Sequence, residues 1–297
     1  MVGEVISTVD EVTPSRAREF RRFRKMFLGR KVVFFGLVII LFFTLVALFA
    51  PIIAPYDPYA IDPSSVLSQP TAKHWLGTDT IGRDTLSRIM YGARTSLEIG
   101  LIAVIVGCII GMTLGTIAGY FGGWTHSIVM RIIDALMSFP SILLALVIAS
   151  LLGSGIKNVI IALSLTMIPA FARLMCGQVL SVTENEYILA ERSIGAGHFR
   201  IMIRHIIPNC LSPIIIMSTM MLGGVILAEA GLSFLGVGIT QPTAAWGSMV
   251  NEGRQYMLKL PILSFAPGIA LMLLVFAFNM VGDGLRDALD PRLRGRI

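Results

Sequence analysis

Six apolar runs, each long enough to cross a bilayer, constrain this chain more than any other feature. A helix rises about 1.5 Å per residue, so about 20 apolar residues span the hydrocarbon core. Only 14% of the residues are charged, against about 25% in soluble proteins. The sequence therefore predicts an all-α integral membrane protein with six transmembrane helices, at Val32–Ala54, Ile99–Tyr120, Ser127–Leu152, Val159–Gly177, Cys210–Gly231 and Ile262–Val281.

Basic residues predict how these spans are oriented. Residues 1–31 hold eight Lys and Arg residues directly before the first span (32–54). Such a run could bind nucleic acid or lipid, but a cytoplasmic anchor that follows the positive-inside rule explains it better. With six spans and the N-terminus inside, 17 of the 24 Lys and Arg residues lie on the cytoplasmic side. We expect a multi-pass plasma-membrane protein with a cytoplasmic N-terminus and a cytoplasmic tail (286–297), and no cleaved signal peptide.

Residues 55–94 are expected to be extracytoplasmic, followed by a transmembrane core over 95–285. Prolines interrupt the first part of this segment, which has no helical periodicity. A short amphipathic helix is expected near its end, before the span that begins at Ile99. His74, Asp79 and Asp84 could suggest a metal site, but their spacing fits no ligand pattern.

Four glycines recur at intervals of four in the second span and form one stripe along a helix. Small residues at this spacing let another helix approach closely. We therefore expect a helix-packing role for Gly107, Gly111, Gly115 and Gly119.

One long polar interruption, residues 183–208, divides the apolar second half of the chain, and its residues predict a hairpin of two short helices. Thr183 and Glu186 have the spacing of a capping box at the start of the first helix. That helix would run through Tyr187 and Ala190. Gly195 suits its end, because glycine adopts the left-handed conformation without a Cβ clash.

The second helix of the hairpin is expected to be amphipathic. Its apolar face would hold Phe199, Met202 and Ile203, and Pro208 would close it before the next span. A structured polar hairpin between two spans is a suitable surface for another protein. The alternative is a helical, basic cytoplasmic loop without a partner.

The hairpin resembles the EAA loop of ABC-importer permeases. The resemblance rests on Ala190, on Gly195 ten residues before His205, and on Pro208 three residues after it, although Leu189 and Glu191 depart from the family pattern. In that family the loop docks in a groove of a cytoplasmic ATPase. The resemblance implies an ATPase-coupling role for Glu186, Tyr187, Ala190, Gly195, His205 and Pro208.

Further motifs resemble the C-type permease subunit of dipeptide/oligopeptide importers. They are HWLGTD with GRD and YGARTSL (from His74), LSFLGVG (from Leu232) and VGDGLRDALDPRLR (from Val281), and the resemblance runs from about residue 20 to the end. It implies a type I ABC importer permease fold. It also implies a B-type permease as heterodimer partner, two cytoplasmic ATPase subunits and an extracytoplasmic substrate-binding protein. Peptides are the implied substrate; nickel, glutathione or another small solute is the alternative, and a self-sufficient secondary transporter is disfavoured.

The chain contains no GxxxxGK[ST] sequence and no nucleophile–base constellation. We therefore expect no enzymatic activity and no cofactor in this chain, with ATP and Mg²⁺ bound by the partner ATPases. Asp134 is expected to form a local ion pair with Arg131. Trp246 and Tyr256 would suit an interface as aromatic anchors. Glu229, at the outer end of a span, is either an interface carboxylate or a contact on the transport pathway.

Overall fold

The computed structural model describes residue 27 and residues 29–289, and helices make up most of this part of the chain. The basic N-terminal residues 1–26 and the end of the tail, 290–297, lie outside the described residues. In chain order the elements are α2 (Lys31–Ile53), the 3₁₀ turn η1 (Pro63–Ser65), α3 (Thr85–Phe121), α4 (Gly123–Met137), α5 (Ser141–Leu152), α6 (Ile156–Thr183), α7 (Glu186–Ser193), α8 (His198–Ile201), the π turn η2 (Met202–Ile206), α9 (Ile207–Phe234), α10 (Trp246–Arg254) and α11 (Ile262–Leu289).

Within the described residues, five helices are long and apolar enough to cross a membrane, and a bent pair makes a sixth span if its two helices are counted together. The bent pair is α4 and α5, whose axes differ by 88°. Pro140 stands directly before α5 and disfavours helical backbone at Phe139, so the helix is interrupted there. The single span expected at Ser127–Leu152 is therefore broken. The helical class is as predicted, and the predicted six spans are reached when this bent pair is counted as one span.

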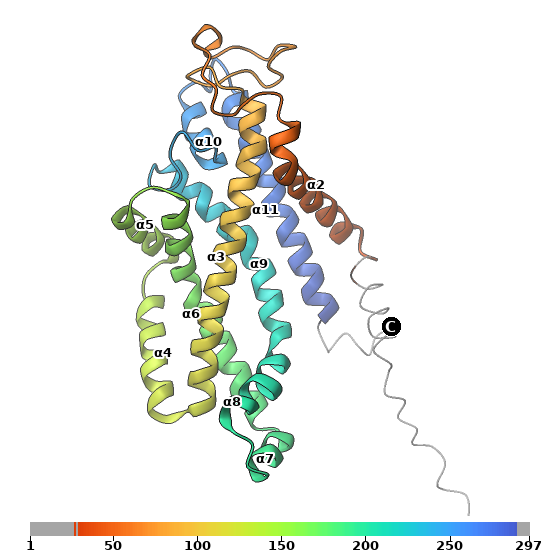
Figure 1. Ribbon diagram of the computed structural model, residues 1–297, viewed down its shortest axis with the longest axis vertical. Coiled ribbons are helices and arrows are strands. Elements are labelled where there is room, and N and C mark those ends of the chain that lie inside the picture. Colours follow the sequence, from red (N-terminus) through yellow and green to blue (C-terminus); the bar gives the residue numbers. More distant parts are fainter. Residues whose placement is uncertain (1–26, 28, 290–297) are drawn as a thin grey trace, which may run out of the picture.

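Helix α3 is longer than the sequence suggested. The short amphipathic helix expected before Ile99 is not separate: the helix runs without a break from Thr85 to Phe121, over 37 residues. Asp84 caps its start by accepting a hydrogen bond from the Ser87 amide. One continuous helix thus connects the two ends of the molecule (Figure 1).

The glycine stripe of α3 faces α6 of the same chain. A Cβ at Gly111 would lie 2.8 Å from the carbonyl oxygen of Ile168, and one at Gly115 would lie 2.4 Å from that of Ala172. Gly107 and Gly119 approach α6 on the same face, each with a carbonyl oxygen 3.0 Å from the Cβ position. Contacts this close leave room for hydrogen atoms only, so the two helices are packed backbone to backbone over about three turns.

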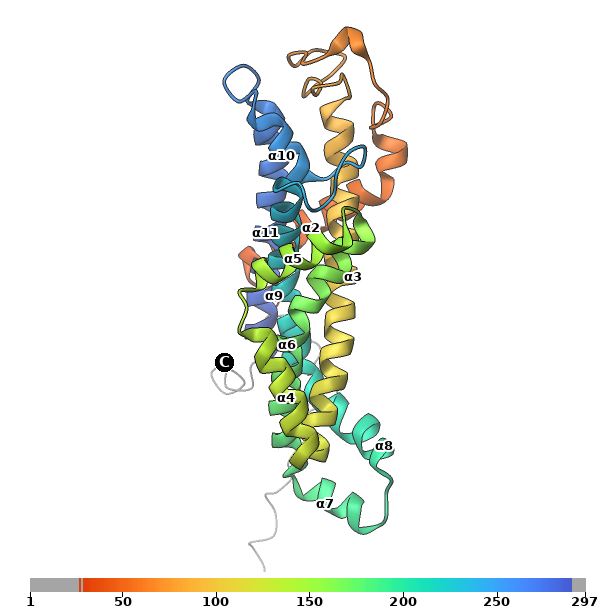
Figure 2. The same ribbon diagram turned by 90° about the vertical axis from the view of Figure 1, so that its left-hand side faces the viewer.

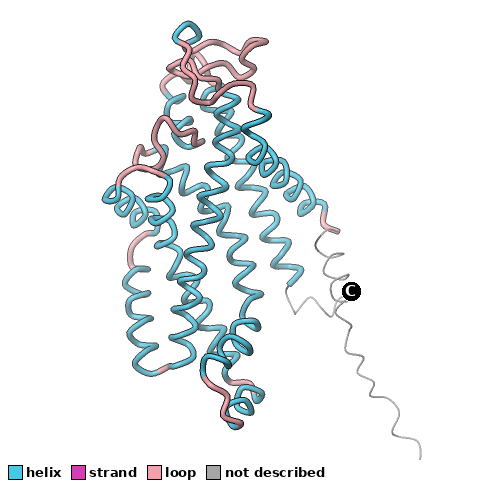
Figure 3. Tube along the Cα trace, viewed as in Figure 1, coloured by secondary structure: helices cyan, strands magenta, loops and turns pink. Residues whose placement is uncertain are grey.

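The elongated molecule has two distinct ends (Figures 1 and 2). At one end lies a hairpin formed by α7 and α8, called the hairpin below (residues 183–208). Long loops gather at the opposite end, drawn in pink at the top of Figure 3. Most of them belong to residues 54–84, called the cap below.

Candidate functional site: the hairpin, the groove and the cap

The first helix of the hairpin starts without the capping box expected from the sequence. Helix α6 continues through Thr183, whose hydroxyl donates to the carbonyl oxygen of Leu180 at 2.8 Å. The N-cap of α7 is Asn185, which makes no side-chain capping bond. The expectation was wrong because α6 runs six residues past the predicted end of the span at Gly177 and takes Thr183 into its last turn. Only two residues therefore separate α6 from α7.

The turn after α7 is a Schellman motif centred on Gly195. Its backbone has φ +80°. The Ala196 amide donates to the Glu191 carbonyl and the Gly195 amide donates to the Arg192 carbonyl, each at 3.0 Å. These bonds satisfy carbonyl groups that the end of a helix leaves free. A Cβ at Gly195 would meet no atom within 4 Å, so the backbone conformation alone demands glycine.

The second helix of the hairpin does not end at Pro208. Helix α8 passes through the π turn at Met202–Ile206 directly into α9, which holds Pro208 in its first turn, where a missing amide hydrogen costs little. The apolar face also differs from expectation. Ile201 and Ile206 are buried. The predicted face fails because Phe199 is 74% exposed and Ile203 is 50% exposed.

The hairpin presents a mixed surface at the tip of the molecule. Glu186, Tyr187 and Ala190 are exposed on α7. Large apolar side chains are exposed beside them, at Leu189, Ile194 and Phe199. His205 and Glu191 are half-buried and face each other across the hairpin, with 3.4 Å between His205 Nε2 and Glu191 Oε1. Exposed apolar side chains gathered at one tip suit a protein partner better than a small molecule.

A groove of about 760 Å³ lies between α6 and α9. Its lining is mainly apolar and rich in methionine, with Met167 on α6 and Met217, Met220 and Met221 on α9. Thr166 and Ser141 contribute hydroxyl groups, and Arg286 of α11 contributes a positive charge. The sequence alone did not identify these residues, because methionines in an apolar run are not distinguishable from lipid-facing ones. Flexible thioether side chains suit a surface that accommodates varied ligands.

Glu229 does not line this groove and does not lie at a water interface. It is 0% exposed. Its carboxylate accepts hydrogen bonds from the hydroxyl groups of Ser233, at 2.8 Å, and Ser96, at 3.2 Å. The Ser233 hydroxyl in turn accepts from the Ile239 amide at 2.9 Å. Glu229 thus joins α9 to α3 and to the loop that follows α9.

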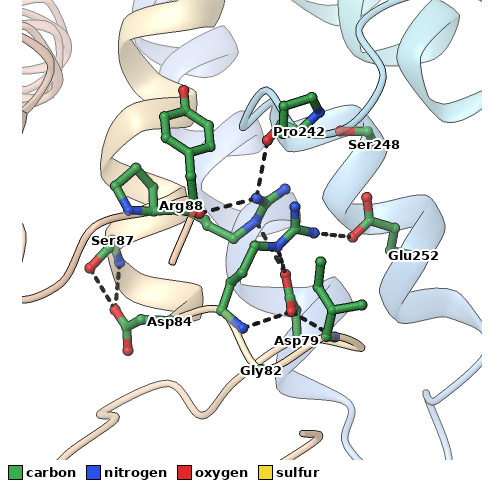
Figure 4. Close-up of polar contacts among 12 residues, drawn as sticks. Asp79, Gly82, Asp84, Ser87, Arg88, Pro242, Ser248 and Glu252 are labelled. Atoms are coloured by element: carbon green, nitrogen blue, oxygen red, sulfur yellow. Dashed lines mark hydrogen bonds and ion pairs between the residues drawn. The ribbon is translucent and has the colours of Figure 1, made fainter. Parts of the chain in front are cut away.

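The cap is fixed to the bundle by a buried cluster of charges (Figure 4). Asp79 accepts from the Arg83 amide at 2.9 Å and from Arg83 Nε at 2.6 Å, and Arg88 Nε lies 3.4 Å from its Oδ2. Arg83 reaches Glu252 on α10 at 3.4 Å. Arg88 also donates to the carbonyl groups of two prolines, Pro58 and Pro242, at 3.3 and 3.4 Å. The cluster therefore fastens the cap, α3 and α10 together.

The cap residues considered for a metal site have other partners. His74 Nδ1 lies 2.9 Å from Asp84 Oδ1, and the ring of His74 packs against that of Tyr56. Asp79 forms ion pairs with Arg83 and Arg88. The described residues contain no group of three or more side chains placed to hold a metal ion.

Two other expectations are corrected by side-chain contacts. Trp246 is 0% exposed, donates to the Ile89 carbonyl at 3.0 Å and packs edge-on against Phe43, so it is a core residue and not an interface anchor. Asp134 pairs with Arg173 on α6 instead of the neighbouring Arg131. In both cases the partner comes from a distant part of the chain.

The arrangement defines a multi-span membrane protein with an exposed hairpin joined directly to the walls of a mainly apolar groove. Residues 111–295 match the family model described as binding-protein-dependent transport system inner membrane component. Residues 19–70 match the model described as the N-terminal TM domain of oligopeptide transport permease C. The chain therefore belongs to the inner-membrane permeases of binding-protein-dependent ABC importers, in the C-type group of the peptide/nickel family. Such a permease is the membrane component of the transporter and is not itself catalytic.

Individual relatives agree with this assignment. The chain is 46% identical over 233 residues to the dipeptide transport system permease protein DppC of Alkalihalophilus pseudofirmus, covering 78% of this chain and 77% of that protein. It is 48% identical over 225 residues to the glutathione transport system permease protein GsiD of Pectobacterium atrosepticum, covering 76% of this chain and 75% of that protein. Among solved structures, the MetNI methionine ABC transporter matches with a TM-score of 0.51 at 17% identity, over 68% of this chain and 97% of that one. This last likeness shows a shared fold.

Proposed function

We propose that this chain forms one half of the translocation pathway of a peptide importer and that the hairpin couples this pathway to cytoplasmic ATPases. One observation carries the proposal: the helices that line the groove are the helices that continue into the hairpin. Only Glu184 and Asn185 separate α6 from α7, and α8 passes into α9 without a loop. A force applied to the hairpin therefore reaches both groove walls without a flexible linker.

The exposed surface of the hairpin supports an ATPase as its partner. Glu186, Tyr187 and Ala190 lie on the outer side of α7, next to the exposed apolar side chains of Leu189 and Ile194. The small side chain of Ala190 allows close approach of a partner surface. We therefore assign these residues, with Gly195 as the turn, to ATPase contact. His205 and Pro208 support the second helix behind that surface.

The distribution of basic residues supports a cytoplasmic hairpin, with the cap outside. In this orientation 17 of the 24 Lys and Arg residues lie on the cytoplasmic side. Both termini are then cytoplasmic. The cap faces the side from which a substrate-binding protein delivers its ligand.

A second permease completes the pathway in this proposal. The groove wall formed by α6 and α9 supplies one side of a passage, and a B-type subunit would supply the other. Two ATPase subunits would then serve the pair, one at each hairpin. This stoichiometry rests on the resemblance to heterodimeric peptide importers.

Peptides are the substrate class that the relatives favour. One relative carries dipeptide in its name and another glutathione, which is itself a tripeptide. The groove is lined by apolar and hydroxyl side chains and by Arg286, and, within the described residues, by no histidine or carboxylate of the kind that binds nickel. An apolar wall with flexible methionines suits varied peptide side chains. Nickel or another small solute remains the alternative cargo.

The proposal is tested by reconstituting the complete transporter in proteoliposomes. Ala190→Arg places a long charged side chain on the docking surface and should abolish the stimulation of ATP hydrolysis by loaded binding protein, while the permease still inserts and pairs. The binding protein is loaded in turn with a dipeptide, a longer peptide, glutathione or Ni²⁺, and uptake is measured. Normal stimulation in the Ala190→Arg complex would refute the coupling role. Uptake of Ni²⁺ alone would refute the substrate class.

A further inference from the structure

One aromatic side chain at the end of α3 touches both helices of the hairpin. Tyr120 is 9% exposed. Its hydroxyl lies 2.9 Å from Nδ1 of His198, the first residue of α8, and the two rings meet edge-on with centroids 5.6 Å apart. The guanidinium carbon of Arg192, in the last turn of α7, lies 5.2 Å from the centre of the Tyr120 ring.

These contacts differ in kind and fix different helices. The hydrogen bond is directional and holds the start of α8. Arg192 lies over the ring face, where a cation is attracted by the negative charge of the π system, so it holds the end of α7. The turn between the two helices is closed by the backbone hydrogen bonds of Gly195 and Ala196, and Ala196 packs against the apolar core. Tyr120 is therefore a single side chain of α3 that contacts both helices flanking this turn.

Helix α3 is suited to carry a displacement away from this point. Its glycine stripe packs it against α6 backbone to backbone. Its other end is capped by Asp84 and carries Arg88, which is fully buried in the charge cluster of the cap. A single helix of 37 residues, about 55 Å at 1.5 Å per residue, thus joins the hairpin to the cap.

We propose that Tyr120 is a positioning residue that transmits movement of the hairpin to α3, and through α3 to the cap. The inference rests on the proposed coupling function of the hairpin and adds a third route to the two flanking helices α6 and α9. In this arrangement, one helix links docking of the binding protein at the cap to ATP hydrolysis by the ATPase at the hairpin. The signal that loaded binding protein has docked on the cap would travel to the hairpin along the same helix.

The test measures ATP hydrolysis by the reconstituted transporter with and without loaded binding protein. Tyr120→Phe removes the hydroxyl but keeps the ring, and should lower the stimulation ratio about three- to tenfold, as expected for one lost hydrogen bond. Tyr120→Ala removes both contacts and should lower it further. Tyr91→Phe, the same change at the opposite end of the same helix, is the matched control and should keep the ratio of the unmodified protein. Co-purification with the ATPases should persist in all three variants.

A double-mutant cycle separates this role from a general loss of structure. If the Tyr120 hydroxyl acts through His198, then Tyr120→Phe combined with His198→Ala should lose no more stimulation than His198→Ala alone. Full additivity, or normal stimulation in Tyr120→Ala, would overturn the inference. Normal stimulation in Tyr120→Ala together with loss in Ala190→Arg would leave the proposed function standing. Normal stimulation in both Tyr120→Ala and Ala190→Arg would refute the proposed function as well.

Discussion

The hydroxyl of Ser96 on α3 donates a hydrogen bond to Glu229 on α9 across 3.2 Å, at a place where both residues are 0% exposed. The other carboxylate oxygen is held by Ser233. An acid inside a bundle needs such partners, because a buried polar group without them is costly. The pair explains why an acid occurs in an apolar span without lining the groove: it ties two helices and the loop after α9 together.

Replacing Glu229 should therefore reduce stability more than it alters the pathway. Glu229→Leu removes the acceptor of two buried hydroxyl groups and should lower the free energy of unfolding by about 1–3 kcal/mol. Glu229→Gln keeps one acceptor oxygen and should cost less. The apparent melting temperature of the detergent-solubilised protein measures both effects. A Leu variant as stable as the unmodified protein would contradict the structural role.

Substitutions in the glycine stripe should disrupt the packing of this chain itself. Gly111→Leu and Gly115→Leu would force side chains into positions where a Cβ already lies less than 3 Å from α6. Overpacking of this kind costs about 1–3 kcal/mol or more, so we expect lower expression and a lower melting temperature. Gly177→Leu on α6 is the matched control, because a Cβ there meets nothing within 4 Å. Equal melting temperatures in the stripe and control variants would contradict the packing.

The charge cluster of the cap should be sensitive to loss of one partner. Arg88→Met removes the more distant of the two cations beside Asp79 and the donor to the Pro58 and Pro242 carbonyl groups. Because Arg83 still pairs with Asp79, we expect a cost of about 1–3 kcal/mol. Arg94→Met, on the same helix but exposed, should cost less than about 0.5 kcal/mol. Resistance of the cap to proteolysis, compared between the two variants, measures the effect. Equal resistance would show that the cluster does not hold the cap.

The features that could be predicted from the sequence are those that depend on the length of an apolar run or on the conformation of neighbouring residues. Six apolar runs predicted the spans, and Gly195 predicted a left-handed turn, because each follows from residues close together in the chain. Side-chain partners across the fold were not predictable in this way. Trp246 looked like an interface anchor, but it fills the space left by Gly92, where a Cβ would lie 2.6 Å from the indole ring. The contacts of Tyr120 could not be predicted from the sequence, because its partners Arg192 and His198 lie more than 70 residues away in the chain.

The same limit explains the errors in the hairpin. Thr183 and Glu186 have the spacing of a capping box, but Thr183 is already the last residue of α6. The second helix was assigned an apolar face from a few residues, in a segment where a π turn shifts the helical register. The buried positions are consequently Ile201 and Ile206. Local patterns therefore located the hairpin correctly and misplaced its inner face.

The proposed orientation predicts a clear labelling pattern in whole cells. In a variant without native cysteines, Ser193→Cys on the exposed tip of the hairpin should react only with a membrane-permeant thiol reagent. Leu258→Cys, between α10 and α11, is also exposed and should react with an impermeant reagent added outside. Both sites are accessible in the structure, so a difference in reactivity reports the side of the membrane. The reverse pattern would refute the orientation and, with it, ATPase docking at the hairpin.

The last prediction separates the conformation of the hairpin turn from its surface. Gly195→Val forces a β-branched residue into a left-handed backbone, which costs about 1–2 kcal/mol. No atom of the described residues lies within 4 Å of the new Cβ, so a loss confined to Gly195→Val comes from the backbone conformation. Gly197→Val is a close control: it lies two residues away and is equally open, but its φ of −66° suits any L-residue. We expect Gly195→Val to lose stimulation of ATP hydrolysis by loaded binding protein while assembling normally, and Gly197→Val to retain most of it. Equal loss in both variants would instead point to a partner surface that cannot accept added bulk anywhere on the turn.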